Sequence, residues 1–250
     1  MVLIIGHRGA RNLWPENSLH GFARTRDLGV DGVEFDVHLA RDGEMVVIHD
    51  PSLERTTAGA GAVANRTARE LAATPLHEGG GAGVPGLEAV LDIFAGTSIE
   101  LHIEIKTDAL GRPYDGLEKR LLDLIDGRQL QERAILTCFV PDILETVRRL
   151  SPRQRVLASL DRRSAEMLGG LPAALDRFAA LGHCLVAVEK GLLMDSYALC
   201  LQRLGGASLG AWVTNEADDI ATWLARPIRQ ITTDRPDIAL ARRRGAHPVA

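Results

Sequence analysis

The chain has 250 residues, of which 46% are hydrophobic and 25% charged, and its formal net charge is −4 at pH 7. This composition is typical of a globular protein with a sizeable core and argues against the disordered and fibrous classes. The lack of a basic excess argues against a nucleic-acid or anionic-membrane partner. We interpret the single basic cluster, at 241–247, as a solvated helix end.

The N-terminal stretch MVLIIGHRGARNLWPENS has only the short apolar run VLII between Met1 and Gly6, with no basic region before it and no long apolar stretch after it. This pattern predicts neither a signal peptide nor a membrane span. The cysteines Cys138, Cys184 and Cys200 are widely spaced within apolar runs, which is typical of reduced core thiols. We therefore expect a cytoplasmic protein without stable membrane association.

Short apolar runs alternate with longer amphipathic stretches along the chain. Strands are predicted at 2–6, 33–39, 99–105, 134–139, 155–160, 184–189, 209–214 and 229–233. Helices are predicted at 18–29, 86–94, 116–125, 141–150, 164–182, 195–206, 216–226 and 236–244. Eight strand–helix units of this kind predict an α/β protein, a (β/α)8 TIM barrel that occupies residues 1–250 as one domain. A doubly wound open sheet is the alternative.

Residues 40–86 interrupt this alternation. The run VVIHD at 46–50 is separated from the second strand by a few residues, whereas parallel neighbours need a crossover of a dozen or more. The chain must therefore turn back as a hairpin. A four-residue loop at 41–44 predicts the cross-strand pairs Ala40–Met45, His38–Val47 and Asp36–His49.

The segment 51–85 is rich in Gly, Thr and Ala and has one short helical pattern at 67–73. We expect it to be a small insertion after the second strand, with little core of its own. Because it leaves from His49 and Asp50, it is predicted to cap the barrel mouth and to select the substrate without taking part in the chemistry.

Charged residues occupy two strands that should be apolar, because strands of a parallel barrel are buried on both faces. With side chains alternating, Glu34 and Asp36 share one face of the second strand, and Glu104 and Lys106 share one face of the third. Three unpaired buried carboxylates are costly unless a cation lies between them. Oxygen ligands favour Mg²⁺ or Ca²⁺. A structural salt-bridge network with Lys106 and Arg8 is the alternative.

His7 and Arg8 directly follow the first strand, at the end of the barrel where such enzymes carry their chemistry. The guanidinium of Arg8 offers a fork of donors suited to a phosphate. The hairpin brings His49 to the same mouth. Two histidines, a divalent cation and an arginine can serve as general acid, general base, charge neutraliser and phosphate ligand, which favours phosphoester hydrolysis.

Six segments in this order resemble the glycerophosphodiester phosphodiesterase family and cover nearly the whole chain: HRGARNLWPENS, VEFDVHLARDGEMVVIHDPSLERTT, VPGLEAVL, IEIK, GAWVTN and ITTDRPDIAL. The resemblance implies a barrel with a segment inserted after the second strand and one divalent cation. It also implies a small-molecule substrate, a glycerophosphodiester, that is hydrolysed to glycerol 3-phosphate and an alcohol.

The positions assigned by the resemblance are His7 and His49 for catalysis, Glu34, Asp36 and Glu104 for the metal, and Arg8, Lys106 and Trp212 for the phosphate and substrate. Glu16 and Asn17 match the motif that closes the first loop. The resemblance leaves open which histidine is the acid, and whether water or the substrate's own hydroxyl attacks. The alternative functions are a phospholipase D of the sphingomyelinase type and a non-catalytic barrel that binds phosphorylated ligands.

Overall fold

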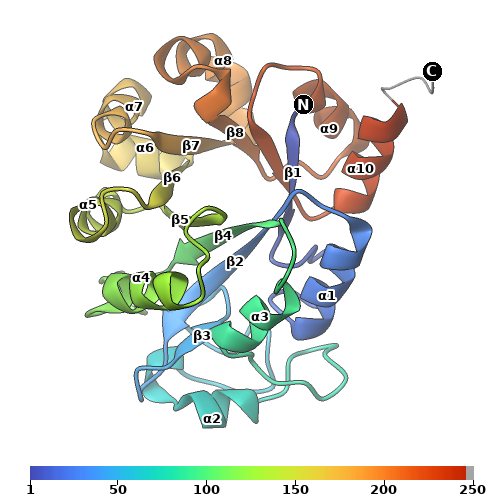
Figure 1. Ribbon diagram of the computed structural model, residues 1–250, viewed down its shortest axis with the longest axis vertical. Helices are drawn as coiled ribbons and strands as arrows, with labels where there is room; N and C mark the ends of the chain where they lie inside the picture. Colours follow the sequence, from blue (N-terminus) through green and yellow to red (C-terminus); the bar gives the residue numbers. More distant parts are fainter. Residues whose placement is uncertain (246–250) are drawn as a thin grey trace.

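The computed structural model describes residues 1–245, and its strands form a closed barrel ringed by helices (Figure 1). Its wall consists of β1 (Leu3–His7), β2 (Gly32–Leu39), β4 (Glu100–Ile105), β5 (Ala134–Cys138), β6 (Arg155–Leu160), β7 (Cys184–Glu189), β8 (Leu209–Trp212) and β9 (Gln230–Thr233), all parallel. Pairing of β1 with both β2 and β9 closes the ring. The predicted (β/α)8 barrel is thus confirmed, and the doubly wound open sheet is excluded. The last five residues of the predicted domain, 246–250, lie outside the described range.

The alternation of side chains on β2 divides the barrel into an outer apolar layer and a polar interior. Phe35 points outward and packs edge-to-face against Phe22, with ring centroids 5.6 Å apart, and Phe22 in turn lies 6.2 Å from Phe94. All three rings are fully buried. Because neighbouring residues of a strand face opposite sides, Glu34 and Asp36 must point into the barrel.

The helices that cover the barrel are α1 (Leu19–Leu28), α3 (Leu87–Ile93), α4 (Leu117–Gly127), α5 (Pro141–Leu150), α6 (Arg162–Met167), α7 (Leu171–Ala179), α8 (Lys190–Leu204), α9 (Ala217–Leu224) and α10 (Pro236–Gly245). The prediction of one helix over 164–182 was wrong. Gly169 and Gly170 have φ values of +89° and +100°, which end α6, and Pro172 stands in the first turn of α7. Within residues 1–245 no helix is both long enough and apolar enough to span a bilayer.

The predicted hairpin forms, but its register differs by one residue from the prediction. Strand β3 (Met45–Val47) pairs antiparallel with β2, and the pairs are Leu39–Met45, His38–Val46 and Val37–Val47. The N–H of Ala40 donates to the carbonyl of Glu44 at 2.9 Å, so Ala40 lies opposite Glu44 and not, as predicted, opposite Met45. His49 therefore follows the end of β3 and is not a cross-strand partner of Asp36.

The insertion contains the 3-10 helix η1 (Val63–Asn65) and α2 (Ala68–Ala72), and it lies beside β3 outside the barrel (Figure 1). The insertion was expected to have little core of its own, and its apolar side chains share a core with the hairpin. Apolar side chains from the hairpin and the insertion form a separate buried cluster: Ala40, Val46, Ile48, Leu53, Val63, Leu71, Leu76 and Val84. The insertion is therefore packed against the hairpin that carries His49.

Candidate active site

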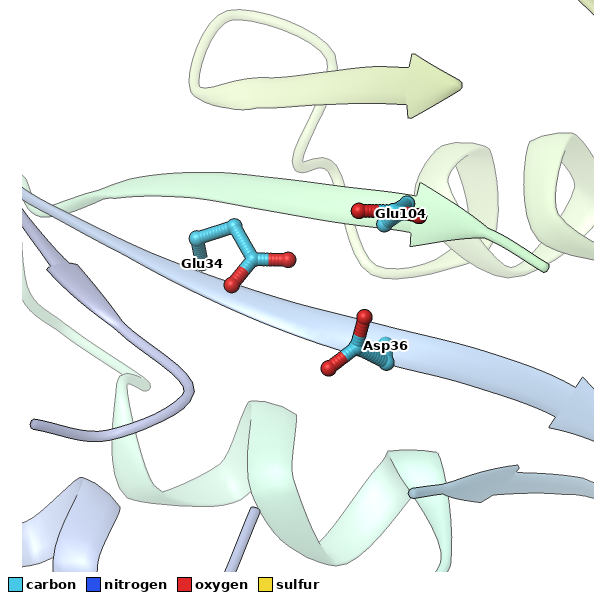
Figure 2. Close-up of side chains that lie close together, drawn as sticks. All are labelled: Glu34, Asp36 and Glu104. Carbon is cyan, nitrogen blue, oxygen red and sulfur yellow. The ribbon is translucent and has the colours of Figure 1, made fainter. Parts of the chain in front are cut away.

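Three carboxylates meet inside the mouth of the barrel, as the sequence predicted. Glu34 and Asp36 lie on β2, and Glu104 lies on β4 directly opposite Asp36 in the parallel register. One oxygen from each residue lies within 4.8 Å of the others, and Figure 2 shows the three side chains gathered between the two strands. Strand register and side-chain alternation are sufficient to produce this cluster.

Two cationic side chains accompany the carboxylates. Lys106 Nζ lies 2.7 Å from Glu104 Oε1 and 3.4 Å from Asp36 Oδ1, and Arg8 Nε lies 3.4 Å from Asp36 Oδ2. Burial opposes ionisation of Asp36, but the charges of Lys106 and Arg8 hold its pKa well below its usual range. The salt-bridge network considered from the sequence is therefore present around Asp36 and Glu104.

That network compensates Glu34 only in part, because the charges of Arg8 and Lys106 lower the pKa of Glu34 less than the other effects raise it. Burial raises the pKa of Glu34 well above its usual value, and the charges of Asp36 and Glu104 raise it further. Among the described residues, neither Glu34 Oε1 nor Asp36 Oδ1 has a hydrogen-bond partner. A buried, oxygen-only cluster with unsatisfied acceptors suits a hard divalent cation, so the residues present fit such an ion.

The first loop holds Arg8 in an uncommon backbone conformation. Arg8, Gly9 and Ala10 have φ values of +49°, +74° and +63°. The N–H of Arg8 donates to Glu34 at 3.2 Å, and its carbonyl accepts from the N–H of Asn17 at 2.9 Å. Such conformations persist where surrounding contacts determine them, often at functional sites. Here they place the guanidinium of Arg8 beside the carboxylate cluster.

His7 is oriented by a carboxylate from the far end of the chain. Its Nδ1 lies 2.6 Å from Oδ1 of Asp234, and its Nε2 lies 3.8 Å from Glu34 Oε2. Asn215 donates to Asp234 Oδ2 at 2.8 Å. Burial opposes ionisation of Asp234, but the contacts with His7, Asn215 and Arg11 together outweigh it and lower the pKa of Asp234 to about 2. Asp234 is therefore ionised and accepts a hydrogen bond from Nδ1 of His7. The other ring nitrogen, Nε2, then faces the cavity.

His49 has the same kind of partner. Its Nδ1 lies 2.6 Å from Oδ1 of Asp50, the next residue. Its backbone carbonyl accepts from Nε2 of His38 at 3.1 Å, and Nδ1 of His38 accepts from the hydroxyl of Tyr114 at 2.8 Å. Burial lowers the pKa of His38 to about 4, so this imidazole is neutral at pH 7 and serves as a fixed donor.

A cavity of about 210 Å³ opens among these groups. Its polar side is lined by His7, Arg8, Glu34, His49 and Glu104, and its opposite wall by Thr137, Phe139, Leu157, Ser159, Ala187 and Trp212. Trp212 donates its indole N–H to the carbonyl of Ala187 at 2.9 Å and packs edge-to-face on Phe139. It therefore presents ring surface, not a donor, to a molecule in the cavity.

The structure brings His7, His49, Arg8, Glu34 and Glu104 to one cavity, with Asp36 and Lys106 directly behind them. Sequence reasoning did not assign roles to Asp234, Asn215, His38 or Tyr114. Asp234 had a detectable signal, because it directly follows the last strand, which neighbours β1 in a closed barrel. Tyr114 lies in an irregular loop after β4 and has no such signal.

Fold and site together define the class, a (β/α)8 barrel with a cavity lined by histidines and carboxylates at the carboxyl ends of its strands. Residues 7–238 match the model of the glycerophosphoryl diester phosphodiesterase family. The chain belongs to this family.

Individual proteins are similar to this chain in sequence or in fold. A glycerophosphodiester phosphodiesterase of Caldanaerobacter subterraneus subsp. tengcongensis is 34% identical over 162 residues, which are 62% of this chain and 65% of that protein. The alignment thus spans slightly less than two thirds of that relative's length. The crystal structure of a glycerophosphodiester phosphodiesterase from Agrobacterium tumefaciens has a TM-score of 0.79 at 23% identity, covering 98% of this chain and 100% of that one.

A third comparison is a structure with a bound molecule. An Oleispira antarctica phosphodiesterase in complex with the product sn-glycerol-3-phosphate has a TM-score of 0.77 at 20% identity. It covers 96% of this chain and 97% of that chain. At these identities both solved structures establish a shared fold.

Proposed function

We propose that this protein hydrolyses glycerophosphodiesters to glycerol 3-phosphate and an alcohol, with His7 and His49 as the acid–base pair. The observation that carries the proposal is the matched orientation of the two imidazoles. Each Nδ1 is held at 2.6 Å by a carboxylate, Asp234 or Asp50, and both side chains line one cavity. The product complex of the Oleispira antarctica relative supports glycerol 3-phosphate as the product.

The imidazoles supply the proton transfers. With the proton of a neutral imidazole on Nδ1, Nε2 is free to accept the proton of the attacking hydroxyl, while a protonated Nε2 donates to the leaving alcohol. Burial is the main cause that lowers the pKa of His49, which favours its neutral form before substrate binds. Because both histidines line one cavity, one can act on the attacking hydroxyl and the other on the leaving alcohol.

Arg8 and Lys106 bind the anionic phosphodiester in this proposal. Burial disfavours the charge on Arg8, but the surrounding carboxylates, first among them Asp36 and Glu34, together raise its pKa, so the guanidinium stays charged. Glu34, Asp36 and Glu104 hold one divalent cation, Mg²⁺ or Ca²⁺. When bound, that cation supplies positive charge against the phosphoryl oxygens. Trp212 and Phe139 form the wall against which the apolar edge of the glycerol or head group packs.

The decisive experiment measures choline release from glycerophosphocholine with Mg²⁺ or Ca²⁺ by wild type, His7→Ala and His49→Ala. We expect each substitution to lower kcat by about 10²–10⁴-fold, the usual contribution of an acid or base, at an unchanged melting temperature. Wild-type turnover in either variant would remove that histidine from the mechanism. Product binding without turnover would favour the non-catalytic alternative, and activity on choline lipids alone would favour the phospholipase D alternative.

A further inference from the structure

Arg55 lies in the insertion, five residues after Asp50, and it joins two carboxylates at the barrel mouth. Its Nε and Nη2 lie 2.5 and 3.1 Å from the two carboxylate oxygens of Asp50. Its Nη1 and Nη2 lie 2.9 and 2.7 Å from the two oxygens of Glu16. One planar guanidinium therefore makes four hydrogen bonds, two to each carboxylate.

Each carboxylate leads directly to a residue of the proposed machinery. Oδ1 of Asp50 lies 2.6 Å from Nδ1 of His49, and Oε1 of Glu16 lies 3.4 Å from Nη1 of Arg8. Arg55 thus ties the hairpin that carries His49 to the first loop, which carries Arg8. None of these contacts requires Arg55 itself to enter the cavity.

The two histidine partners differ in how they are supported. Asp234 is fully buried, and Asn215 and Arg11 also contact it. The side chain of Asp50 is 24% exposed and belongs to the segment after the three-residue strand β3. A carboxylate in that position can rotate into solvent unless a second group fixes it, and a planar guanidinium is suited to fix it.

We propose that Arg55 is a positioning residue for catalysis, which holds Asp50 in place and thereby orients the imidazole of His49. This inference rests on the proposed function of His49. It changes the expectation that the insertion only selects substrate, because one of its side chains then supports the proton transfer. Arg55 is not among the residues that line the cavity, so in this proposal it acts through Asp50 and His49.

The test is a double-mutant cycle with glycerophosphocholine, using Arg55→Gln, His49→Ala and the double variant. Arg69→Gln is the matched control, because Arg69 is an exposed arginine on α2 of the same insertion. Misplacing a catalytic group by about 1 Å can cost about 10²-fold, so we expect Arg55→Gln to lower kcat by about 10–100-fold in wild type. In the His49→Ala background we expect a loss of less than about threefold, because the imidazole it orients is gone.

Arg55→Lys separates charge from geometry, since one ammonium cannot make the four-bond fork. We expect this variant to stay well below wild-type kcat, and it replaces Arg55→Gln in the cycle if the latter does not fold. An equal loss in both backgrounds, or full rescue by lysine, would overturn the positioning role. If Arg55→Gln has wild-type kcat and His49→Ala is inactive, this inference is overturned and the proposed function stands. If His49→Ala is fully active, the proposed function itself is overturned.

Discussion

Nδ1 of His7 lies 2.6 Å from Oδ1 of Asp234, a residue 227 positions further along the chain. The contact exists because β1 and β9 pair in parallel and close the barrel, so the residues at their carboxyl ends become neighbours. An ionised Asp234 keeps the Nδ1 proton on His7 and stabilises its imidazolium form. The pair therefore has the geometry of an oriented acid–base group.

Asp234→Asn should lower kcat on glycerophosphocholine by about 10²–10⁴-fold with a much smaller change in KM, because the amide neither stabilises the imidazolium nor enforces the tautomer. Steady-state kinetics measure this directly. Adding His7→Ala to the Asp234→Asn variant should lower kcat little further. If Asp234→Asn keeps wild-type kcat, the tautomer of His7 is set by another group.

Removal of divalent ions with EDTA should abolish turnover, and Mg²⁺ or Ca²⁺ should restore it better than Zn²⁺, because the ligands are carboxylate oxygens. Isothermal titration calorimetry gives a readout independent of activity. Glu34→Gln and Glu104→Gln should each weaken the binding of the restoring ion. Full activity in EDTA, with no heat of binding, would support a purely structural role for Lys106 and the three carboxylates.

The raised pKa of Glu34 predicts a pH-dependent stability of the metal-free protein. Between the ordinary glutamate pKa near 4.5 and the higher folded value, the folded state binds more protons than the unfolded state, so the contribution of Glu34 to stability falls as pH rises. Glu34→Gln removes this effect. In EDTA, we expect the variant to melt above wild type at pH 8 by about 2–4 °C, equivalent to about 1 kcal/mol.

The difference between the two proteins should shrink toward pH 5, where Glu34 is protonated. The quantity to compare is the difference in melting temperature between Glu34→Gln and wild type. The buried histidines, which lower stability as pH falls, affect both proteins equally and cancel in this difference. His38, with a pKa of about 4, contributes stability that is lost as pH falls from about 6.5 to 4. A constant difference across this range would contradict the assignment of a raised pKa to Glu34.

Trp212→Ala should raise KM for glycerophosphocholine by about tenfold and change kcat little, because the ring offers contact area and no hydrogen bond to the cavity. Trp212→Phe, which keeps an aromatic face, is the matched control and should lie near wild type. A large loss of kcat in the alanine variant would instead mean that this wall aligns the reacting phosphoryl group.

Leu71→Ala should leave a cavity in the core shared by the insertion and the hairpin and destabilise it by about 2–5 kcal/mol. Because Ile48 belongs to that core and precedes His49, kcat should fall together with local order, as measured by hydrogen exchange of residues 45–50. A matched Leu→Ala change far from the hairpin, Leu144→Ala in α5, should leave kcat unchanged. Equal losses of kcat in the two variants would show that this core does not specifically support His49.

The sequence by itself determined the strands and the composition of the site. Apolar runs bounded by turn residues located eight barrel strands, and period-two alternation placed Glu34, Asp36 and Glu104 on interior faces. Both signals are local, since they depend on residues within a few positions of one another. Such signals are weakest at breaks and turns, where the Gly169–Gly170 break and the register of the hairpin between β2 and β3 were mispredicted.

Only the tertiary structure decided which groups support the site residues. Asp234 reaches His7 through closure of the barrel, Tyr114 reaches His38 from an irregular loop, and Arg55 joins Asp50 to Glu16 across two loops. These contacts depend on which distant segments come together in the fold. The periodicity of the sequence does not predict which segments these are. The residues of the candidate site can thus be predicted from local pattern, whereas the contacts that orient His7 and hold Asp50 follow from long-range packing that exists only in the folded chain.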